Sequence, residues 1–169
     1  MKIRYGDFMR ISPVFITRSL IIASVYTAVT LMLGYISYGE LQFRVSDAMI
    51  ILPLIVGLGL DAVVGLTIGG LLGNLASPFI PWDWVFGPLA NLVASTIVYL
   101  VGRTRLNTYV KLAVSSILAS LAIAVIVGYE LTVIYGLPEL TILYIFISEL
   151  VIIGVIGGLV YRSLRVFFK

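Results

Sequence analysis

Three polar side chains lie inside apolar stretches of this sequence: Asn74, Asn91 and Glu149. Glu149 follows Glu139 by ten residues, which places it roughly 15 Å further along a helix. An ionised carboxylate at that depth in a bilayer costs at least about 2.5 kcal/mol. We therefore expect Glu149 to face neighbouring helices, where a ligand uses it. The alternative is that all three residues hydrogen-bond between helices, as polar groups in membrane bundles do.

The segment "GELQFRVSDA" (39–48) gathers further polar residues between two apolar runs, among them Gln42, Arg44 and Asp47. Polar segments between apolar runs also contain flat aromatic side chains. They are Phe43 in this segment and Trp84, next to Asp83, in the segment 77–84. Asn74 and Asn91 lie near the ends of their apolar runs, on the side of these polar segments. The pattern predicts a polar pocket at one end of a helical bundle. Alternatively, Arg44 and Asp47 pair with each other, and the tryptophans anchor at the membrane interface.

Composition indicates an integral membrane protein, because 61% of the 169 residues are hydrophobic and only 11% are charged. The mean hydropathy is +1.16. The sequence contains no Cys and no His, which excludes disulfides, thiolate chemistry and imidazole catalysis. We find no catalytic constellation, no phosphate-binding loop and no metal-ligand motif. An enzyme is therefore not expected, and neither is a nucleic-acid partner, because the basic residues are better explained as topology signals.

The apolar runs predict an all-α, six-helix transmembrane bundle in one domain, 1–169. The second and third spans form a hairpin that turns near Gly57, Gly59 and Asp61. Arg44 is the one basic residue expected on the outer side, against ten on the side of the two termini, so the positive-inside rule places both termini in the cytoplasm of a plasma-membrane protein. The expected spans are about 13–37, 48–60, 62–77, 84–102, 109–129 and 140–164.

Small residues at four-residue spacing predict where helices approach closely. One stripe is Gly65, Gly69 and Gly73, and another runs through 116, 120, 124 and 128. Both are expected to pack inside the bundle. Ser24 and Ala28 give the first span a smooth face, which packs inside the bundle or docks another membrane protein.

Three stretches resemble the QueT family, the substrate-binding (S) components of energy-coupling factor (ECF) transporters assigned to queuosine precursors. They are "YGELQFRVSDAMIILPLI" (38–55), "GLTIGGLLGNLASP" (65–78) and "DWVFGPLANLVAS" (83–95). The sequence departs from the family pattern at Asp47, where a Glu is expected, and the resemblance is weak over 103–169.

The resemblance implies a protein that captures a deazaguanine-like precursor outside the cell and works with a transmembrane coupling (T) component and two cytoplasmic ATPases. Those partners use ATP, and this chain needs no cofactor. Ser24 and Ala28 would contact the coupling component. Another flat vitamin, similar to thiamine or riboflavin, and a non-transporting membrane scaffold remain alternatives.

The same resemblance suggests roles for the polar residues. Glu149 would accept two N–H groups from a guanine-like edge, and Asn74 or Asn91 would bond the ring. Phe43 or Trp84 would stack on the ring. Gln42, Arg44 and Asp47 would close the pocket, and Asp47 or Asp83 would meet a cationic arm.

Overall fold

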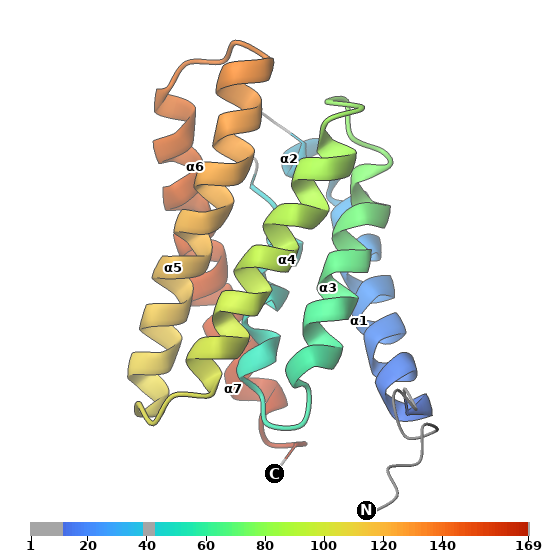
Figure 1. Cartoon of the computed structure of the whole chain (residues 1–169), viewed down its shortest axis with the longest axis vertical. Coiled ribbons are helices and arrows are strands. Elements are labelled where there is room, and N and C mark those ends of the chain that lie inside the picture. Colours follow the sequence, from blue (N-terminus) through green and yellow to red (C-terminus); the bar gives the residue numbers. More distant parts are fainter. Residues whose placement is uncertain (1–11, 39–42, 169) are drawn as a thin grey trace, which may run out of the picture.

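The computed structural model describes residues 12–38 and 43–168, and these residues form a bundle of helices that run alternately up and down (Figure 1). Helix α1 begins and α7 ends at the same, lower end of the bundle. The helices are α1 Pro13–Met32, α2 Gly34–Ser37, η1 Val45–Leu54, α3 Gly59–Asn74, α4 Asp83–Gly102, α5 Thr108–Tyr129, η2 Glu130–Ile134, α6 Leu140–Val151, η3 Ile152–Ile156 and α7 Gly157–Leu164.

Four helical segments of the described chain are long and apolar enough to cross a membrane: Pro13–Met32, Asp83–Gly102, Thr108–Ile134 and Leu140–Leu164. Helix α3, with 16 residues, measures about 24 Å. Of the six spans that we expected, four are such long helices, and the second and third are the shorter elements η1 and α3. The count of six membrane crossings stays a prediction. The expected helix at 48–60 is instead the ten-residue 3-10 helix η1, about 20 Å long. The chain reverses after η1, at 55–58, close to the predicted turn, and Gly57 there has φ of 95°.

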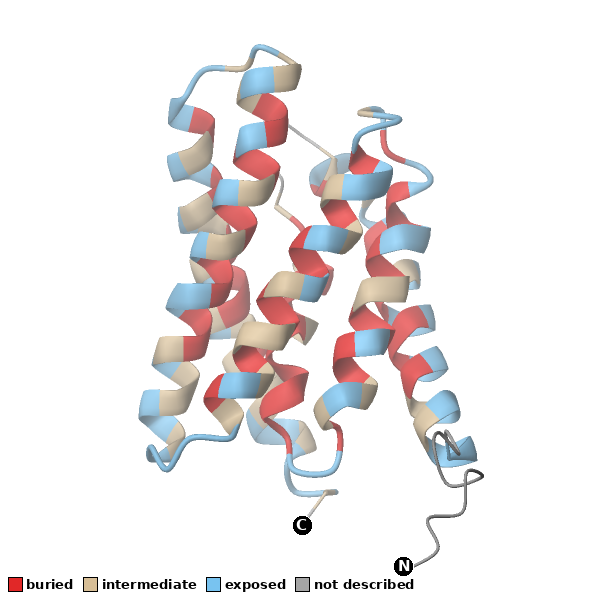
Figure 2. Cartoon of the chain, viewed as in Figure 1, coloured by how far each residue is buried: buried red, intermediate tan, exposed pale blue. Residues whose placement is uncertain are grey.

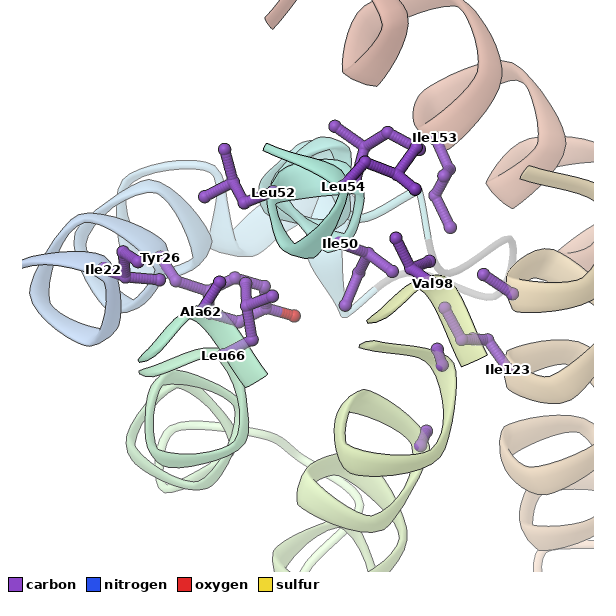
Figure 3. Packing of buried hydrophobic residues seen from close by; sticks show 14 of the residues in the cluster. Ile22, Tyr26, Ile50, Leu52, Leu54, Ala62, Leu66, Val98, Ile123 and Ile153 are labelled. Atoms are coloured by element: carbon purple, nitrogen blue, oxygen red, sulfur yellow. The ribbon is translucent and has the colours of Figure 1, made fainter. Parts of the chain in front are cut away.

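η1 lies in the centre of the bundle. It contacts α1, α3, α4, α5, η3 and α7, and most of its residues are buried. Ile50, Leu52 and Leu54 on η1 pack with Leu66 of α3 and Ile153 of η3 in the hydrophobic core (Figure 3). Across the bundle, buried residues follow the inner faces of the helices (Figure 2). A short helix in this position carries Asp47 into the middle of the protein.

The predicted glycine stripe packs α3 against α1, as expected. A Cβ atom added at Gly65 would lie 2.6 Å from the Ser19 carbonyl oxygen, and one at Gly69 would lie 2.9 Å from Cβ of Tyr26. Only a residue without a side chain allows this separation. The second stripe is also internal: its Ser116 and Gly128 lie against η3 and α6 respectively.

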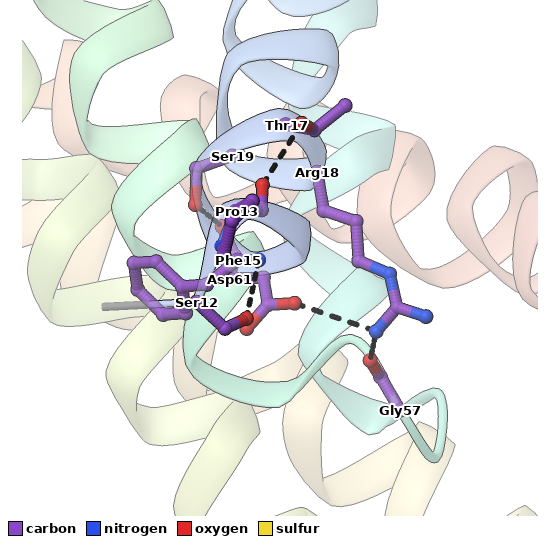
Figure 4. A network of polar contacts seen from close by, with 8 residues as sticks. All are labelled: Ser12, Pro13, Phe15, Thr17, Arg18, Ser19, Gly57 and Asp61. Atoms are coloured by element: carbon purple, nitrogen blue, oxygen red, sulfur yellow. Dashed lines mark hydrogen bonds and ion pairs between the residues drawn. The ribbon is translucent and has the colours of Figure 1, made fainter. Parts of the chain in front are cut away.

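The lower end is held together by Arg18 (Figure 4). Its guanidinium lies 3.5 Å from the Asp61 carboxylate and 2.5 Å from the Gly57 carbonyl oxygen. Asp61 lies in the first turn of α3, whereas we expected it in the turn between the second and third spans. The other basic residues of the described chain, except Arg44, lie just after α4, in the first turn of α5, or in and just after the last turn of α7. They are Arg103, Arg105, Lys111, Arg162 and Arg165.

Candidate ligand-binding site

Three elements bring polar side chains together in the interior: Asp47 comes from η1, Asn91 from α4 and Glu149 from α6. Each of the three is at most 2% exposed. They line one small cavity together with Arg44, whose side chain is also buried. The apolar walls of the cavity come from Ala90, Ile123, Val127 and Ile145. Four of the residues that we predicted for the pocket therefore do meet at one place.

Tyr26 is a fifth polar residue at this place, and sequence reasoning did not find it. Its side chain is fully buried, and its hydroxyl donates a hydrogen bond to the Asp47 carboxylate. The hydroxyl also lies 3.4 Å from Oδ1 of Asn91, and the Asn91 amide nitrogen donates to the Leu66 carbonyl oxygen at 3.0 Å. These bonds fix the direction of the Asn91 side chain.

The electrostatics of the cavity are dominated by acids. The carboxyl groups of Asp47 and Glu149 lie within hydrogen-bonding reach of each other. Two adjacent buried carboxylates repel unless a proton or a cation lies between them. Burial disfavours the charge on Arg44, but Tyr26 and the nearby carboxylates outweigh this effect, so the pKa of Arg44 is raised above its usual value. Arg44 thus supplies positive charge to the site.

Further polar residues lie nearer the upper end: Asp83 and Glu130 interact with each other, and the Asn74 amide packs against Gly87, one turn after Asp83. All three are buried, and the Ser77 hydroxyl donates a hydrogen bond to Asp83. We had expected Glu130 to lie in an outer loop, but α5 continues through η2 to Ile134 and carries Glu130 inside. The signal for this was present in the sequence, since the apolar spacing of Ile123, Val127 and Leu131 continues the helix past position 130.

The remaining predicted residues lie elsewhere. Gln42 falls outside the described residues. Phe43 is half-buried beside Arg44, whereas Trp84 is 42% exposed on α4, and neither lines the cavity. Ser24 and Ala28 are exposed on α1, on the face opposite to the one that packs against α3.

The cavity is closed in this conformation. Its volume is about 10 Å³, which is enough for about one water molecule. A larger hollow, of about 260 Å³, opens at the lower end between η1 and α4, but the one charged residue of its lining is Arg103. The group of hydrogen-bonding residues makes the small cavity the better candidate for a ligand site.

A π-helical turn begins at or shortly after each of two buried acids. Glu130 is the first residue of η2, and η3 begins three residues after Glu149. Turns of this kind occur frequently at functional sites in helices, because the extra residue changes the direction of neighbouring side chains. Both π turns thus lie next to a buried acidic side chain, Glu130 or Glu149.

Comparison with known proteins gives one result that bears on identity. No curated protein and no solved structure matches the chain. The family model of the QueT transporter matches residues 16–166, and so includes the region beyond 103 where the resemblance read from the sequence was weak. The predicted resemblance is confirmed, and the chain belongs to the QueT transporter family.

Proposed function

We propose that this protein is the S component of an ECF-type transporter that captures a queuosine precursor outside the cell. Membership of the QueT family implies an S component of this type. The observation that carries the choice of ligand is the meeting of Asp47, Asn91 and Glu149 with Arg44 around one buried cavity. These groups offer hydrogen bonds suited to the edge of a deazaguanine ring.

Glu149 is the residue that we assign to the guanine-like edge. Among the described residues, its Oε2 atom is buried without a hydrogen-bond partner. A carboxylate accepts two parallel N–H groups, so it matches the N1–H and exocyclic amine of such a ring. Asn91 would bond the ring from α4. Phe43 would stack on the ring from its position next to Arg44, an interaction worth about 1–3 kcal/mol by analogy with base stacking.

Ligand entry requires the site to widen. A cavity of about 10 Å³ cannot hold a bicyclic ring, so the walls must move apart when the ligand binds. The ligand would then replace contacts that the polar residues make with one another, such as that between Asp47 and Glu149. Binding should therefore be accompanied by a rearrangement around η1.

The orientation that we propose places the lower, basic end of the bundle in the cytoplasm. This follows from the positive-inside rule and from the position of Arg18, Arg103 and Arg165 at that end. Because the chain has no Cys, single cysteines can report the orientation. A cysteine at Pro138 should react with an impermeant maleimide on intact cells, and one at Leu106 should not. The opposite pattern would refute the orientation.

The inward step is assigned to partners. A transmembrane coupling component and two cytoplasmic ATPases would use ATP to deliver the bound precursor. The sequence itself supports this division of labour, because its glycine-rich segment 65–74 lacks the Gly-Lys-Ser/Thr sequence of a phosphate-binding loop.

The decisive experiment measures ligand binding by the full chain in detergent. Mass spectrometry first identifies any small molecule that copurifies, and titration then compares deazaguanines with thiamine and riboflavin. We expect saturable binding of a deazaguanine. Glu149→Gln should weaken it at least tenfold, about 1.4 kcal/mol. Glu139→Gln, at an exposed site, should leave it unchanged. Tighter binding of thiamine or riboflavin would show that the ligand is not a deazaguanine. Binding of none of the three would refute the proposal.

One observation favours a second candidate, a membrane scaffold that binds no small molecule. The bonds from Tyr26 to Asp47 and from Asn91 to the Leu66 carbonyl oxygen already join helices, as polar contacts in a purely structural bundle would. In that case the same titration would show no saturable binding, and Glu149→Gln would change only the stability of the protein.

A further inference from the structure

A groove opens at the lower end of the bundle, where α5 begins and α7 ends (Figure 1). α5 packs against η3, but α7 makes no comparable contact with α5. The groove between them has a volume of about 300 Å³, which is in the range of pockets that hold small molecules. It is separate from the polar cavity around Glu149, and the proposed function gives it no role.

The deeper part of the groove is apolar. Gly154 and Gly158 leave a notch in the helix surface, and no atom lies within 4 Å of a Cβ placed at Gly158. Leu112 of α5 forms the opposite side of the groove. Val155 and Leu159 border the notch and are 61% and 62% exposed. Because lipid tails are as apolar as leucine, a notch of this kind suits an acyl chain.

The mouth of the groove is basic. Arg162 in the last turn of α7 and Arg165 just after it line the mouth, and both are exposed. Arg165 lies over the ring of Tyr161, 5.9 Å from its centre. Within the part of the chain that the structure describes, Asp61 is the one acid at this end, and it already pairs with Arg18. Two positive charges therefore face the groove without a carboxylate to balance them.

The arginines and the glycines lie along one side of the helix. Gly154, Gly158 and Arg162 follow one another at four-residue spacing, and Arg165 comes three residues later. Residues at these spacings are neighbours on a helix surface. The eleven residues from Gly154 to Arg165 cover about 16 Å, which is close to half of a hydrocarbon core of about 30 Å. The groove therefore has the length of one bilayer leaflet.

We propose that this groove binds one anionic phospholipid, with its phosphate at Arg162 and Arg165 and one acyl chain in the glycine notch. Basic pockets between transmembrane helices bind anionic headgroups in this way. A guanidinium group suits a phosphate, because two of its N–H donors bond two oxygens at once. Thr108 and Tyr109 line the mouth from the side of α5 and add hydroxyl groups for the headgroup. The inference does not depend on the identity of the transported ligand.

Another apolar hollow near this end lacks the same combination. It lies between α1, η1 and α7, has a volume of about 350 Å³, and has Arg18 as its one charged lining residue. The Arg18 guanidinium is already bonded to Asp61 and to the Gly57 carbonyl oxygen. A phosphate there would have to displace a carboxylate. The groove between α5 and α7 is therefore the better lipid site.

The test measures which lipids the full chain retains. The protein is exchanged into mixed micelles that contain equal amounts of phosphatidylglycerol and phosphatidylcholine with the same acyl chains, and bound lipids are counted by native mass spectrometry. The wild-type protein should retain one phosphatidylglycerol and at least fivefold less phosphatidylcholine. The double variant Arg162→Gln/Arg165→Gln should lose this preference. Arg103→Gln/Arg105→Gln removes the same charge from the same end outside the groove and should keep it.

Gly158→Leu tests the apolar notch. The new side chain would fill open space, so the protein should unfold at the same temperature while the retention of phosphatidylglycerol falls at least fivefold. Ala113→Leu adds bulk at an exposed position of α5 outside the groove and should change neither quantity. Glycerol 3-phosphate, which has the phosphate and no acyl chain, should not displace the lipid even in hundredfold excess.

The outcomes decide between a lipid site and a general attraction of charge. Equal retention of the two lipids by the wild-type protein would overturn the proposal, and this comparison needs no variant. Equal loss of preference in the two double arginine variants would overturn it too, because the charge would then act without a site. Undiminished retention in Gly158→Leu, or displacement by glycerol 3-phosphate, would show that no acyl chain occupies the notch. Deazaguanine binding is measured separately, so the proposed function stands or fails on its own.

Discussion

Tyr26 shows how closely the interior polar residues depend on one another. Its ring lies in the hydrophobic core, while its hydroxyl reaches Asp47 and lies near Asn91. A buried carboxylate that loses a hydrogen-bond donor carries the full cost of its lost solvation. Tyr26 therefore holds Asp47 in place at the cavity and links α1 to η1.

Replacement of Tyr26 by Phe tests this role. Tyr26→Phe keeps the ring and removes only the hydroxyl, so the packing of α1 should survive while Asp47 loses its donor. We expect the free energy of unfolding to fall by about 1–3 kcal/mol. Unfolding of the purified protein in detergent, followed by circular dichroism, measures the change.

Tyr144→Phe is the matched control, because Tyr144 lies on α6 with 46% of its surface exposed. Its stability should equal that of the wild-type protein. If both variants were equally stable, the bond from Tyr26 to Asp47 would carry no net stabilisation.

Isolated polar residues were the part of the site that the sequence could reveal. Asn91 and Glu149 stand out because each interrupts an apolar run, and the structure places both at the cavity. Tyr26 gave no such signal, since tyrosine is ordinary in an apolar helix and its partners come from distant segments. Glu130 was missed because the expected span ended at 129, although the apolar spacing of Ile123, Val127 and Leu131 continues the helix through it.

At the scale of elements, the main departure from expectation is η1. Its residues are apolar enough for a span, and hydropathy alone could not separate a transmembrane helix from a short buried one. In the structure, η1 is a ten-residue 3-10 helix that packs against α1, α3, α4, α5, η3 and α7. By contrast, the segments 13–32, 84–102 and 140–164 were predictable, because length and apolarity there determine a span directly.

The contact between α1 and α3 depends on the absence of side chains on α3. In Gly65→Ala, the new methyl group would meet the Ser19 carbonyl oxygen at 2.6 Å and Cβ of Ile22 at 2.8 Å. The two helices would have to separate, which should lower the free energy of unfolding by about 1–3 kcal/mol. Thermal unfolding in detergent gives the measurement.

Gly158→Ala should act in the opposite direction. Nothing lies within 4 Å of a Cβ placed at Gly158 in α7. Ala is preferred to Gly in a helix by about 1 kcal/mol, so this variant should be as stable as the wild-type protein or slightly more stable. A stabilising effect of Gly65→Ala would show that α1 is not closely packed on the glycine stripe.

The molecule as a whole is polarised along its long axis. Basic side chains gather at the lower end, where α1 begins and α7 ends, and Arg18 joins α1 to the turn before α3 there. The buried acids and amides lie in the interior away from that end, on η1, α3, α4, η2 and α6. Such an arrangement suits a protein that receives a ligand at one membrane surface and meets cytoplasmic machinery at the other.

The exposed face of α1 is the place where the whole molecule would meet its coupling component. Ser24 and Ala28 are small and exposed there, between the larger exposed side chains Ile21 and Met32. Close approach of two membrane helices requires small residues at four-residue spacing, so a bulky side chain at either position should block it. Ser24→Trp and Ala28→Trp should therefore reduce the amount of coupling component that copurifies with the tagged chain, while deazaguanine affinity stays unchanged. Ile147→Trp, on the exposed face of α6, serves as the control. Equal recovery of the coupling component with all three variants would place the contact on another face of the bundle.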